Sequence, residues 1–368
     1  MRGVRAHYCL TESVRHTVAR FSTGASDTMK QTALDQISVK GKFERKESQF
    51  RNFVGKEESN KFQPERNRYH LYISRACPWA NRTHQFVNLK GLQDVIQIHS
   101  VHPTWRRTRP EEDSHSGWHF VGEGEEEYVD DFGRSHSTQG CTPDRLNGCK
   151  TVRELYDLAA GGTWDKSAFT TPVLWCSKEK TIVNNESSEI CRMLNNSFNE
   201  FAKNKHVDLY PDRLSEKIAE LEGWVYHDIN NGVYKCGFAS SQEAYDEAVG
   251  TLFGALDRVE AVLDKSRYLA GDQITGIDVW LFNTLIRFDA VYVVYFKTCK
   301  KCLREYHNIL NYLKDLYQVP EIGETVDFWN IRTHYFTSHP KLNPHGIVPP
   351  MPDVDYNSQH DRATRKYN

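Results

Sequence analysis

The chain has 368 residues, of which 39% are hydrophobic, 12% aromatic and 26% charged, with a formal net charge of -2. This balance is typical of a globular protein of one or two domains, and it excludes a strong electrostatic attraction to nucleic acid or to an anionic membrane. The longest apolar stretches, residues 279–286 and 290–296, are too short to span a bilayer, so we expect neither a nucleic acid nor a membrane as a partner.

Residues 1–26 have the composition of an organelle transit peptide. They contain four arginines, one acidic residue and frequent serine and threonine. Four apolar residues would share one face of a helix: Leu10, Val14, Val18 and Phe21. We therefore expect a mitochondrial or other organellar location, the alternative being a basic tail on a cytoplasmic protein.

A strand, a helix and a second strand are predicted in succession over residues 69–101. Residues 69–74 have strand composition, residues 79–90 have helical spacing, and residues 95–101 form the second apolar strand. This order is a βαβ unit, and it places Cys77 at the start of the helix.

A charged and glycine-rich stretch, residues 103–168, follows as a long loop or insertion, with a helix predicted over residues 151–160. Residues 172–175 and 180–183 then predict a two-stranded hairpin, and residues 186–194 predict a helix with an acidic start. The βαβ unit followed by a hairpin and a helix is the arrangement of a thioredoxin-like domain.

After Pro211 the strand signal ends, and apolar spacing predicts only helices. They are expected over residues 214–229, 244–263, 277–288, 303–316 and 328–336. Thr275 and Asp278 match a capping box, in which each side chain binds the other's backbone amide. The fold class is therefore an α/β thioredoxin-like N-terminal domain followed by an all-α C-terminal domain.

These signals divide the chain into five expected parts, with the two folded domains meeting near residues 200–212. The parts are a transit peptide (1–26), an extended polar arm (27–66), the thioredoxin-like domain (67–205), the all-helical domain (206–342) and an irregular, proline-containing tail (343–368).

Cys77 is the candidate nucleophile. A thiol attacks as the thiolate, and the unpaired amides and dipole of a helix N-terminus stabilise a thiolate. The alternative is an inert cysteine at the end of a strand. Ala80 stands where a dithiol oxidoreductase has its second cysteine. A disulfide formed at Cys77 would therefore need an external thiol to clear it, and glutathione is the abundant cellular candidate.

The other cysteines predict no metal site. Of the nine in the chain, only Cys299 and Cys302 form a C-x-x-C, and no second pair lies nearby. The odd number and the lack of a secretory signal indicate a reducing compartment.

Two further signals accompany Cys77. Pro172 is expected to form a cis peptide bond at the start of the strand that faces the catalytic helix. Glu186 and Ser187 begin a helix, where they could hold the ammonium and the carboxylate of a γ-glutamyl group. Each has an ordinary alternative, a trans proline at a strand edge and simple helix capping. In this order, the three signals together favour a glutathione site.

The stretch RYHLYISRACPWANR, residues 68–82, resembles the signature of the S-glutathionyl-hydroquinone reductases, which are the Xi-class glutathione transferases. The resemblance extends over most of the chain from about residue 43 to residue 352. It is carried by SQFRNFV (48–54), GWHF (117–120), and further stretches at 170–195, 230–249, 267–292 and 334–352.

The resemblance implies a glutathione-transferase fold, usually homodimeric, with glutathione as co-substrate. Cys77 would attack the sulfur of a small aromatic glutathionyl-hydroquinone, and a second glutathione would resolve the Cys77–glutathione disulfide. The positions that match the family's glutathione-binding residues are Trp118, Val173, Glu186 and Ser187. Those that match its hydroquinone pocket are Tyr234 and Tyr335, although each tyrosine alone would be an ordinary core residue.

The chain departs from the family pattern at three places. Asn81 replaces the histidine of the usual CPWAHR, Tyr295 replaces another histidine, and residues 121–150 are longer than typical. Asn81 lies beside the nucleophile and the other two could reshape the aromatic pocket. These departures affect the expected substrate range more than the expected reaction.

Two other functions stay open. One is an omega-like thioltransferase or dehydroascorbate reductase that uses the same Cys77, and the other is a non-catalytic scaffold of the same fold. Removing the hydroxyls of Tyr234 and Tyr335 would affect only quinone substrates, and a calorimetric test of glutathione binding would identify a scaffold.

Overall fold

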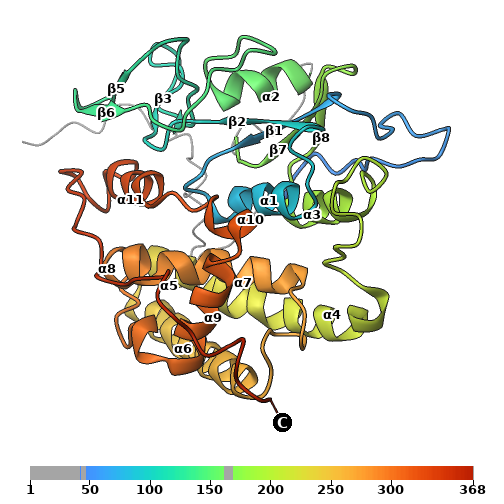
Figure 1. Ribbon diagram of the computed structural model, residues 1–368. Helices are drawn as coiled ribbons and strands as arrows, with labels where there is room; N and C mark the ends of the chain where they lie inside the picture. Colours follow the sequence, from blue (N-terminus) through green and yellow to red (C-terminus); the bar gives the residue numbers. More distant parts are fainter. Residues whose placement is uncertain (1–41, 43–46, 161–168, 368) are drawn as a thin grey trace, which may run out of the picture.

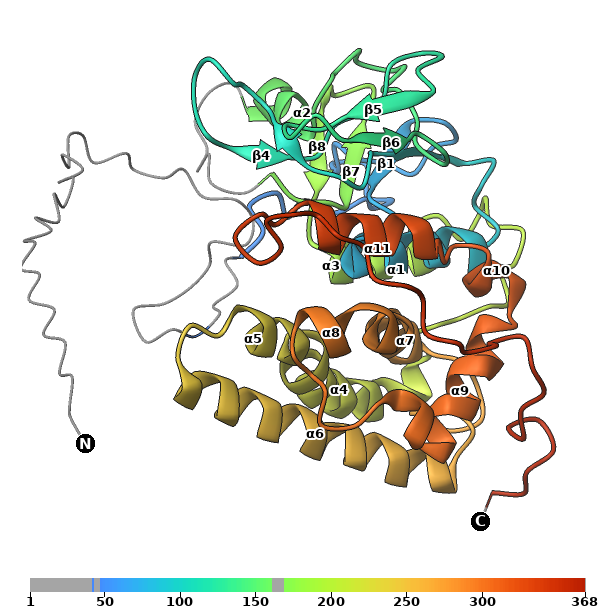
Figure 2. The ribbon, with the colours of Figure 1, turned by 90° about the vertical axis from the view of Figure 1, so that its left-hand side faces the viewer.

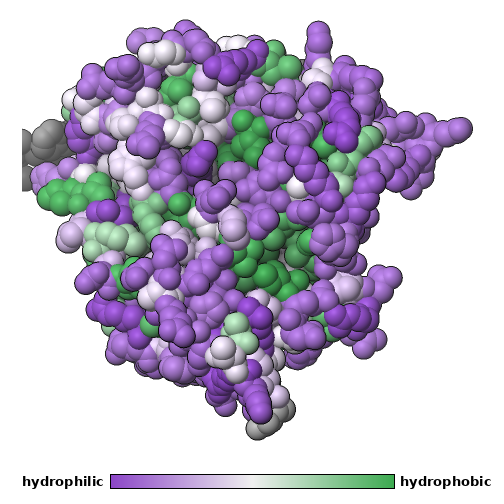
Figure 3. All heavy atoms as spheres, viewed as in Figure 1, coloured by the Kyte–Doolittle hydropathy of each residue, from purple (hydrophilic) through white to green (hydrophobic). Residues whose placement is uncertain are grey.

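The computed structural model describes residues 42, 47–160 and 169–367. The predicted transit peptide, residues 1–26, lies outside the described residues. The described chain forms an upper part built on a β-sheet and a lower part built from helices (Figure 1). Its surface is mostly hydrophilic on the face seen in Figure 3, where hydrophobic residues show mainly between the two parts.

A four-stranded mixed sheet organises the upper part, in the order β2-β1-β7-β8. Strands β1 (Tyr69–Ile73) and β2 (Ile96–Ser100) are parallel and are connected through helix α1 (Pro78–Leu89). Strand β7 (Val173–Cys176) runs antiparallel to β1, and β8 (Thr181–Asn184) runs antiparallel to β7. The predicted βαβ unit and hairpin are therefore confirmed.

Both faces of the sheet are covered by helices. Helices α1 and α3 (Ser187–Asn196) lie under one face, and α2 (Val152–Ala160) lies over the other (Figure 1). Every residue of β1 is buried, as expected for a strand covered on both sides. Alternate β1 residues enter the two cores, with Leu71 on the α1 side and Tyr72 packed with the cluster that contains α2 residues.

The described end of the N-terminal arm pairs with the edge of this sheet. The amide of Asn52 donates to the carbonyl of Val183 at 3.0 Å, and the amide of Asn185 donates to that of Phe50 at 3.1 Å. These hydrogen bonds pair backbone groups that would otherwise be unpaired at the edge of the sheet. They also hold residues 48–52 beside the start of α3.

The stretch after β2 is folded, although the sequence marked it only as a loop or insertion. It contains two short antiparallel pairs: β3 (Arg106–Arg107) with β4 (Ser116–Gly117), and β5 (Glu127–Val129) with β6 (Ser135–Ser137). The buried carboxylate of Asp130 accepts hydrogen bonds from Arg134 at 2.7 Å and from His136 at 2.9 Å. Strands of two or three residues are too short for a periodic signal, so they could not be predicted.

The lower part is helical, as predicted. Its longer helices are α4 (Ser215–Trp224), α5 (Gly232–Phe238), α6 (Gln242–Lys265), α7 (Gly276–Arg287), α9 (His307–Tyr317) and α11 (Phe328–Thr337). Shorter turns connect them: η1 (Asp212–Leu214), η2 (Val225–Asn230), η3 (Phe288–Tyr292), α8 (Val293–Tyr295), η4 (Leu303–Glu305) and α10 (Pro320–Gly323). Within the residues that the structure describes, no helix is both long and apolar enough to cross a membrane.

Two details differ from the expectation. The helix predicted over residues 214–229 is interrupted, because its second half is the π-helical turn η2. Helix α5 was not predicted, since Gly232 and Gly237 weaken its helical signal. Gly237 is required by packing, because a Cβ there would clash with the ring of Phe296.

The predicted capping box at the start of α7 is confirmed. The buried carboxylate of Asp278 accepts from the amide of Thr275 at 2.9 Å and from its hydroxyl at 2.7 Å. It also accepts from the amide of Leu269 and the hydroxyl of Tyr312, each at 2.9 Å. One carboxylate therefore joins α7, α9 and the loop before α7.

Helix α11 returns to the upper part and lies in the layer of α1 and α3 (Figure 2). His334 Nδ1 is 2.8 Å from the carbonyl oxygen of Pro103, which follows β2. The hydroxyls of Thr104 and Thr337 are 2.8 Å apart, and the amide of Trp105 donates to Ser338 at 3.0 Å. These contacts fix Tyr335 against the upper part.

Candidate active site

Cys77 occupies the N-cap of α1, with Pro78 in the first turn. The side chain is partly exposed, and Sγ lies 3.5 Å from the carbonyl oxygen of Thr171. The Thr171–Pro172 bond is cis, as predicted. The thiol thus stands where helix amides have no intrahelical partner, facing the start of β7.

The structure places three of the four predicted glutathione-binding residues around the ends of β7 and β8. Val173 begins β7, Glu186 is the N-cap of α3, and Ser187 is its first residue. Trp118 lies in the long connection after β2 and is buried. Its ring centroid is 4.6 Å from that of His334, and it shares a buried cluster with Val173.

Arg82 links these residues to α1, although sequence reasoning gave it no role. Its Nη2 donates to the hydroxyl of Ser187 at 2.6 Å and lies 3.7 Å from Glu186 Oε1. The guanidinium is buried, 4.0 Å from the ring centroid of Trp280 and 5.0 Å from that of Trp79. Arg82 belongs to the CPWANR part of the stretch that carries the family resemblance. The sequence could not show that its side chain would bind Ser187.

Glu186 has a capping role and also lines a pocket. Its carboxylate accepts from the amide of Ser188 at 3.1 Å and from the hydroxyl of Ser48, in the arm, at 3.1 Å. The adjoining pocket has a volume of about 360 Å³ and is lined by Glu47, Ser48, Arg51, Glu186, Ser188, Glu222, Gly223, Tyr226 and Trp280. The arm, the start of α3 and the helical part therefore enclose the side of the site that carries Glu186.

The two predicted pocket tyrosines meet, and a third joins them. The hydroxyl oxygen of Tyr335 lies 2.7 Å from that of Tyr234 and 3.1 Å from that of Tyr292. We name these three residues the tyrosine cluster. Tyr292 was not predicted as a site residue, although it ends the stretch 267–292 that carries part of the family resemblance. Nothing in the sequence distinguishes a pocket tyrosine from a core tyrosine.

The tyrosine cluster lies next to the first turn of α1, since the ring centroid of Tyr234 is 6.4 Å from that of Trp79, two residues after Cys77. Burial raises the pKa of Tyr234 well above its ordinary value, and negative charge on Tyr292 and Cys77 raises it further. Burial likewise raises the pKa of Tyr292, while the charge of Arg287 opposes this rise. The cluster is therefore a set of neutral phenols that can donate hydrogen bonds near the thiol.

Two of the three departures from the family pattern are single substitutions, Asn81 and Tyr295, and only Tyr295 lies against a predicted pocket residue, with its ring centroid 6.2 Å from that of Tyr335. Asn81 is fully buried, and its Nδ2 donates to Asn283 Oδ1 in α7 at 3.1 Å. The hydroxyl of Tyr295 lies 3.0 Å from Nδ1 of His339. Asn81 thus connects α1 to the helical part.

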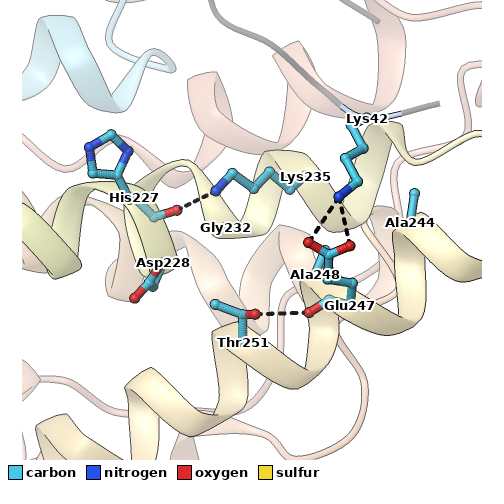
Figure 4. Close-up of a pocket in the computed structure, with 9 residues that line it drawn as sticks. All are labelled: Lys42, His227, Asp228, Gly232, Lys235, Ala244, Glu247, Ala248 and Thr251. Atoms are coloured by element: carbon cyan, nitrogen blue, oxygen red, sulfur yellow. Dashed lines mark hydrogen bonds and ion pairs between the residues drawn. The ribbon is translucent and has the colours of Figure 1, made fainter. Parts of the chain in front are cut away.

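A second pocket of about 250 Å³ lies between η2, α5 and α6 (Figure 4). Lys42 forms an ion pair with Glu247 at 2.7 Å, and Lys235 donates to the carbonyl oxygen of His227 at 3.0 Å. None of the predicted site residues lines it. Over residues 42, 47–160 and 169–367, no three His, Cys, Asp or Glu side chains are placed to hold a metal ion.

Comparisons with known proteins agree with this geometry. Family models match the glutathione S-transferase N-terminal domain over residues 76–197 and the C-terminal domain over residues 242–314. Glutathionyl-hydroquinone reductase YqjG of Escherichia coli is 44% identical over 340 residues, covering 91% of this chain and 96% of the relative. Glutathione S-transferase omega-like 2 of Schizosaccharomyces pombe is 43% identical, covering 88% of this chain and 97% of the relative.

Solved structures agree as well. The Xi-class glutathione transferase of Natrialba magadii has 46% identity and a TM-score of 0.76, covering 85% of this chain and 88% of that chain. The glutathione-bound structure of YqjG has 42% identity and a TM-score of 0.77, covering 86% of this chain and 97% of that chain. The chain therefore belongs to the glutathione S-transferase family and, within it, to the Xi class.

Proposed function

We propose that this protein is a glutathionyl-hydroquinone reductase, which uses glutathione to remove the glutathionyl group from S-glutathionyl-hydroquinones. The observation that carries the proposal is the placement of Cys77 at the N-terminus of α1, where the ring of Trp79, in the first turn, has its centroid 6.4 Å from that of Tyr234 in the tyrosine cluster. The name of the E. coli relative, a glutathionyl-hydroquinone reductase, supports the same activity.

In the first step, the Cys77 thiolate attacks the sulfur of the bound glutathionyl-hydroquinone. A sulfur–sulfur bond forms to Cys77 while the sulfur–carbon bond breaks, and its electron pair leaves with the aromatic carbon. That carbon takes up a proton, so the hydroquinone is reduced and the two sulfurs become a mixed disulfide. In the proposal, a phenol of the tyrosine cluster donates this proton.

In the second step, the thiolate of a second glutathione attacks the glutathionyl sulfur of the mixed disulfide. Glutathione disulfide leaves and the Cys77 thiolate is restored. The sum is one glutathionyl-hydroquinone and one glutathione converted to one hydroquinone and one glutathione disulfide. Ala80 stands in the place of a resolving cysteine, which is why the second thiol must come from solution.

Glutathione would bind along the edge formed by β7 and the start of α3. In the proposal, Val173 offers backbone hydrogen bonds beside Pro172, while Ser187 and Glu186 hold the carboxylate and the ammonium of the γ-glutamyl end. Arg82 supports Ser187 through the bond at 2.6 Å. Trp118, buried against His334, would close the side of the site next to Val173.

An omega-like thioltransferase is the second candidate, since the S. pombe relative is named a glutathione S-transferase omega-like protein and the chemistry proposed at Cys77 would be the same. A homodimer and an organellar location are further parts of the proposal. Sedimentation tests the dimer, and the location of a fluorescent fusion with and without residues 1–26 tests the targeting.

The test of the function is turnover of glutathionyl-menadiol with excess glutathione by the wild type and by Cys77→Ser. We expect the wild type to release menadiol and glutathione disulfide, and the variant to lose activity by at least roughly 1,000-fold. Cys299→Ser, at an exposed cysteine, is the matched control. A wild type that reduces only small mixed disulfides would favour the thioltransferase instead.

A further inference from the structure

Arg287, the last residue of α7, is a fully buried cation that reaches across to the turn before Cys77. Its Nε donates to the carbonyl oxygen of Ala76 at 3.0 Å, and its Nη2 donates to that of Arg75 at 3.1 Å. Its Nη1 donates to the carbonyl oxygen of Asn283 at 2.8 Å and to Asn283 Oδ1 at 3.2 Å. The helical part thus holds the two residues that precede the nucleophile.

The partners of Arg287 are unusual for a buried charge. All four are neutral oxygens, and no carboxylate of the described residues forms an ion pair with it. A buried guanidinium without an anion is costly, and a neutral side chain could fill the same space. The guanidinium of arginine has several donors in one rigid plane, so it can bind two successive carbonyls at once. We therefore infer that this position requires arginine for the arrangement of its donors and not for its charge.

Asn283 fixes the guanidinium in this orientation. Its Oδ1 accepts from Arg287 and from Asn81, and its Nδ2 donates to Gln85 Oε1 at 2.6 Å and to the carbonyl oxygen of Val279 at 2.9 Å. Two donors on one side and two acceptors on the other define how the amide points. Asn81 therefore helps to hold Arg287, although it replaces the family's usual histidine.

A π-helical turn connects Arg287 to the tyrosine cluster. In an α-helix, residues five apart point about 140° away from each other. The turn η3, Phe288–Tyr292, closes with a wider i→i+5 pattern, which brings the fifth residue back toward the face of the first. Tyr292 then reaches Tyr335 at 3.1 Å. The charge of Arg287 acts on the pKa of Tyr292, opposing the larger rise due to burial.

We propose that Arg287 is a positioning residue that sets the turn carrying Cys77 in register with the tyrosine cluster. On one side, its guanidinium donates hydrogen bonds to the carbonyls of Arg75 and Ala76. On the other side, the π-turn that begins directly after Arg287 ends at Tyr292, a member of the tyrosine cluster. The sulfur and the phenols come from different parts of the fold, and Arg287 bonds to the two residues before the sulfur while lying five residues before Tyr292 in the chain. The role of the cluster in this inference rests on the proposed reductase function.

The experiment compares Arg287→Gln and Arg287→Lys with the wild type in two measurements. The first is the rate at which iodoacetamide alkylates Cys77, followed on the Cys77 peptide by mass spectrometry, which needs no enzyme substrate. The second is kcat and KM with glutathionyl-menadiol and glutathione. We expect Arg287→Gln to slow alkylation by about tenfold and to lower kcat by roughly 100-fold, with the KM for glutathione within about twofold. Arg287→Lys should recover part of kcat.

Arg362→Gln is the matched control. Arg362 is also a buried arginine that donates to main-chain carbonyls, to Leu263 at 2.8 Å and to Arg267 at 2.7 Å, but it lies in the C-terminal segment. Its loss should lower thermal stability while the alkylation rate and kcat stay within about twofold.

Unchanged alkylation and kcat in Arg287→Gln would overturn the proposal. If that variant does not fold, Arg287→Lys decides, since it should slow alkylation by at least about threefold and an unchanged rate would contradict positioning. A wild type without reductase activity whose alkylation still depends on Arg287 would support positioning of Cys77 and overturn only the reductase function.

Discussion

The hydroxyl oxygens of Tyr234 and Tyr335 lie 2.7 Å apart, although 101 positions separate the two residues in the chain. Tyr234 comes from α5 and Tyr335 from α11, and Tyr292 from η3 reaches the same hydroxyl of Tyr335. Burial raises the pKa of Tyr335 well above its ordinary value, and the neighbouring Tyr234 adds to the rise. Tyr335 therefore stands at the centre of a hydrogen-bonded set of neutral phenols.

Replacing Tyr335 with Phe should remove the centre of this set. We expect kcat with glutathionyl-menadiol to fall by about 10- to 100-fold, because a positioned proton donor contributes on that order, whereas reduction of a small mixed disulfide should change by less than about threefold. Steady-state kinetics with both substrates measures the difference. Tyr317→Phe, in α9 and outside the cluster, is the control. Equal losses with both substrates would show that the cluster supports Cys77 itself and not the aromatic substrate.

Shortening Arg82 should weaken glutathione binding. Arg82→Met deprives Ser187 of its donor at 2.6 Å and removes the guanidinium beside Glu186. A hydrogen bond to a charged group contributes about 1.5–3 kcal/mol, so the Kd for glutathione should rise by roughly 10- to 100-fold. Isothermal titration calorimetry on the Cys77→Ser background isolates binding from turnover. Arg192→Met, which removes a partly exposed ion pair with Glu222, is the control. An unchanged Kd for Arg82→Met would place the γ-glutamyl end elsewhere.

Asp278→Asn should destabilise the helical part without touching the site. The carboxylate is fully buried and accepts four hydrogen bonds. In the asparagine variant, the NH₂ group would face amides and hydroxyls that are themselves hydrogen-bond donors, so some of these bonds would be lost. We expect a loss of about 2–4 kcal/mol in the free energy of unfolding. Urea unfolding measures it, with the exposed Asp272→Asn as control. A loss below roughly 0.5 kcal/mol would mean that the capping box adds little to stability.

Stability should fall as the pH is lowered from about 6.5 toward 4. Burial lowers the pKa of His334, His102 and His119 to about 4 in the folded protein. Histidine in an unfolded chain titrates near 6.5. Below that pH the unfolded chain binds protons that the native chain does not, so each such histidine lowers stability progressively, by up to roughly 3 kcal/mol near pH 4.

Urea unfolding at pH 7, 6 and 5 measures this dependence. His334→Gln should reduce the slope of stability against pH, because one proton fewer is taken up on unfolding. The exposed His345→Gln is the control and should leave the slope as it is. A stability that does not change between pH 7 and pH 5 would contradict the lowered pKa values.

The local elements of this protein could be predicted from its sequence. The strand before Cys77, the helix after it, the cis bond at Pro172 and the capping box of Thr275 and Asp278 all depend on residues only a few positions apart. Strand alternation, helical spacing and cap residues are signals of that range. The motif around Cys77 also carried the resemblance to the family, which the comparisons confirm.

Packing between distant segments decided the rest. The sequence contains Arg287, Asn283 and Asn81, but nothing in it predicts that they would meet behind the nucleophile, with Arg287 and Ala76 211 positions apart. The π-turn η3 could not be predicted either, since the apolar pattern of residues 277–288 is followed directly by the apolar stretch 290–296. Hydrogen bonds between buried polar groups form only once the cores have brought the two parts of the fold together. For that physical reason the sequence alone predicted Cys77 as the nucleophile and determined the helix that follows it, and the tertiary structure alone decided which side chains surround them.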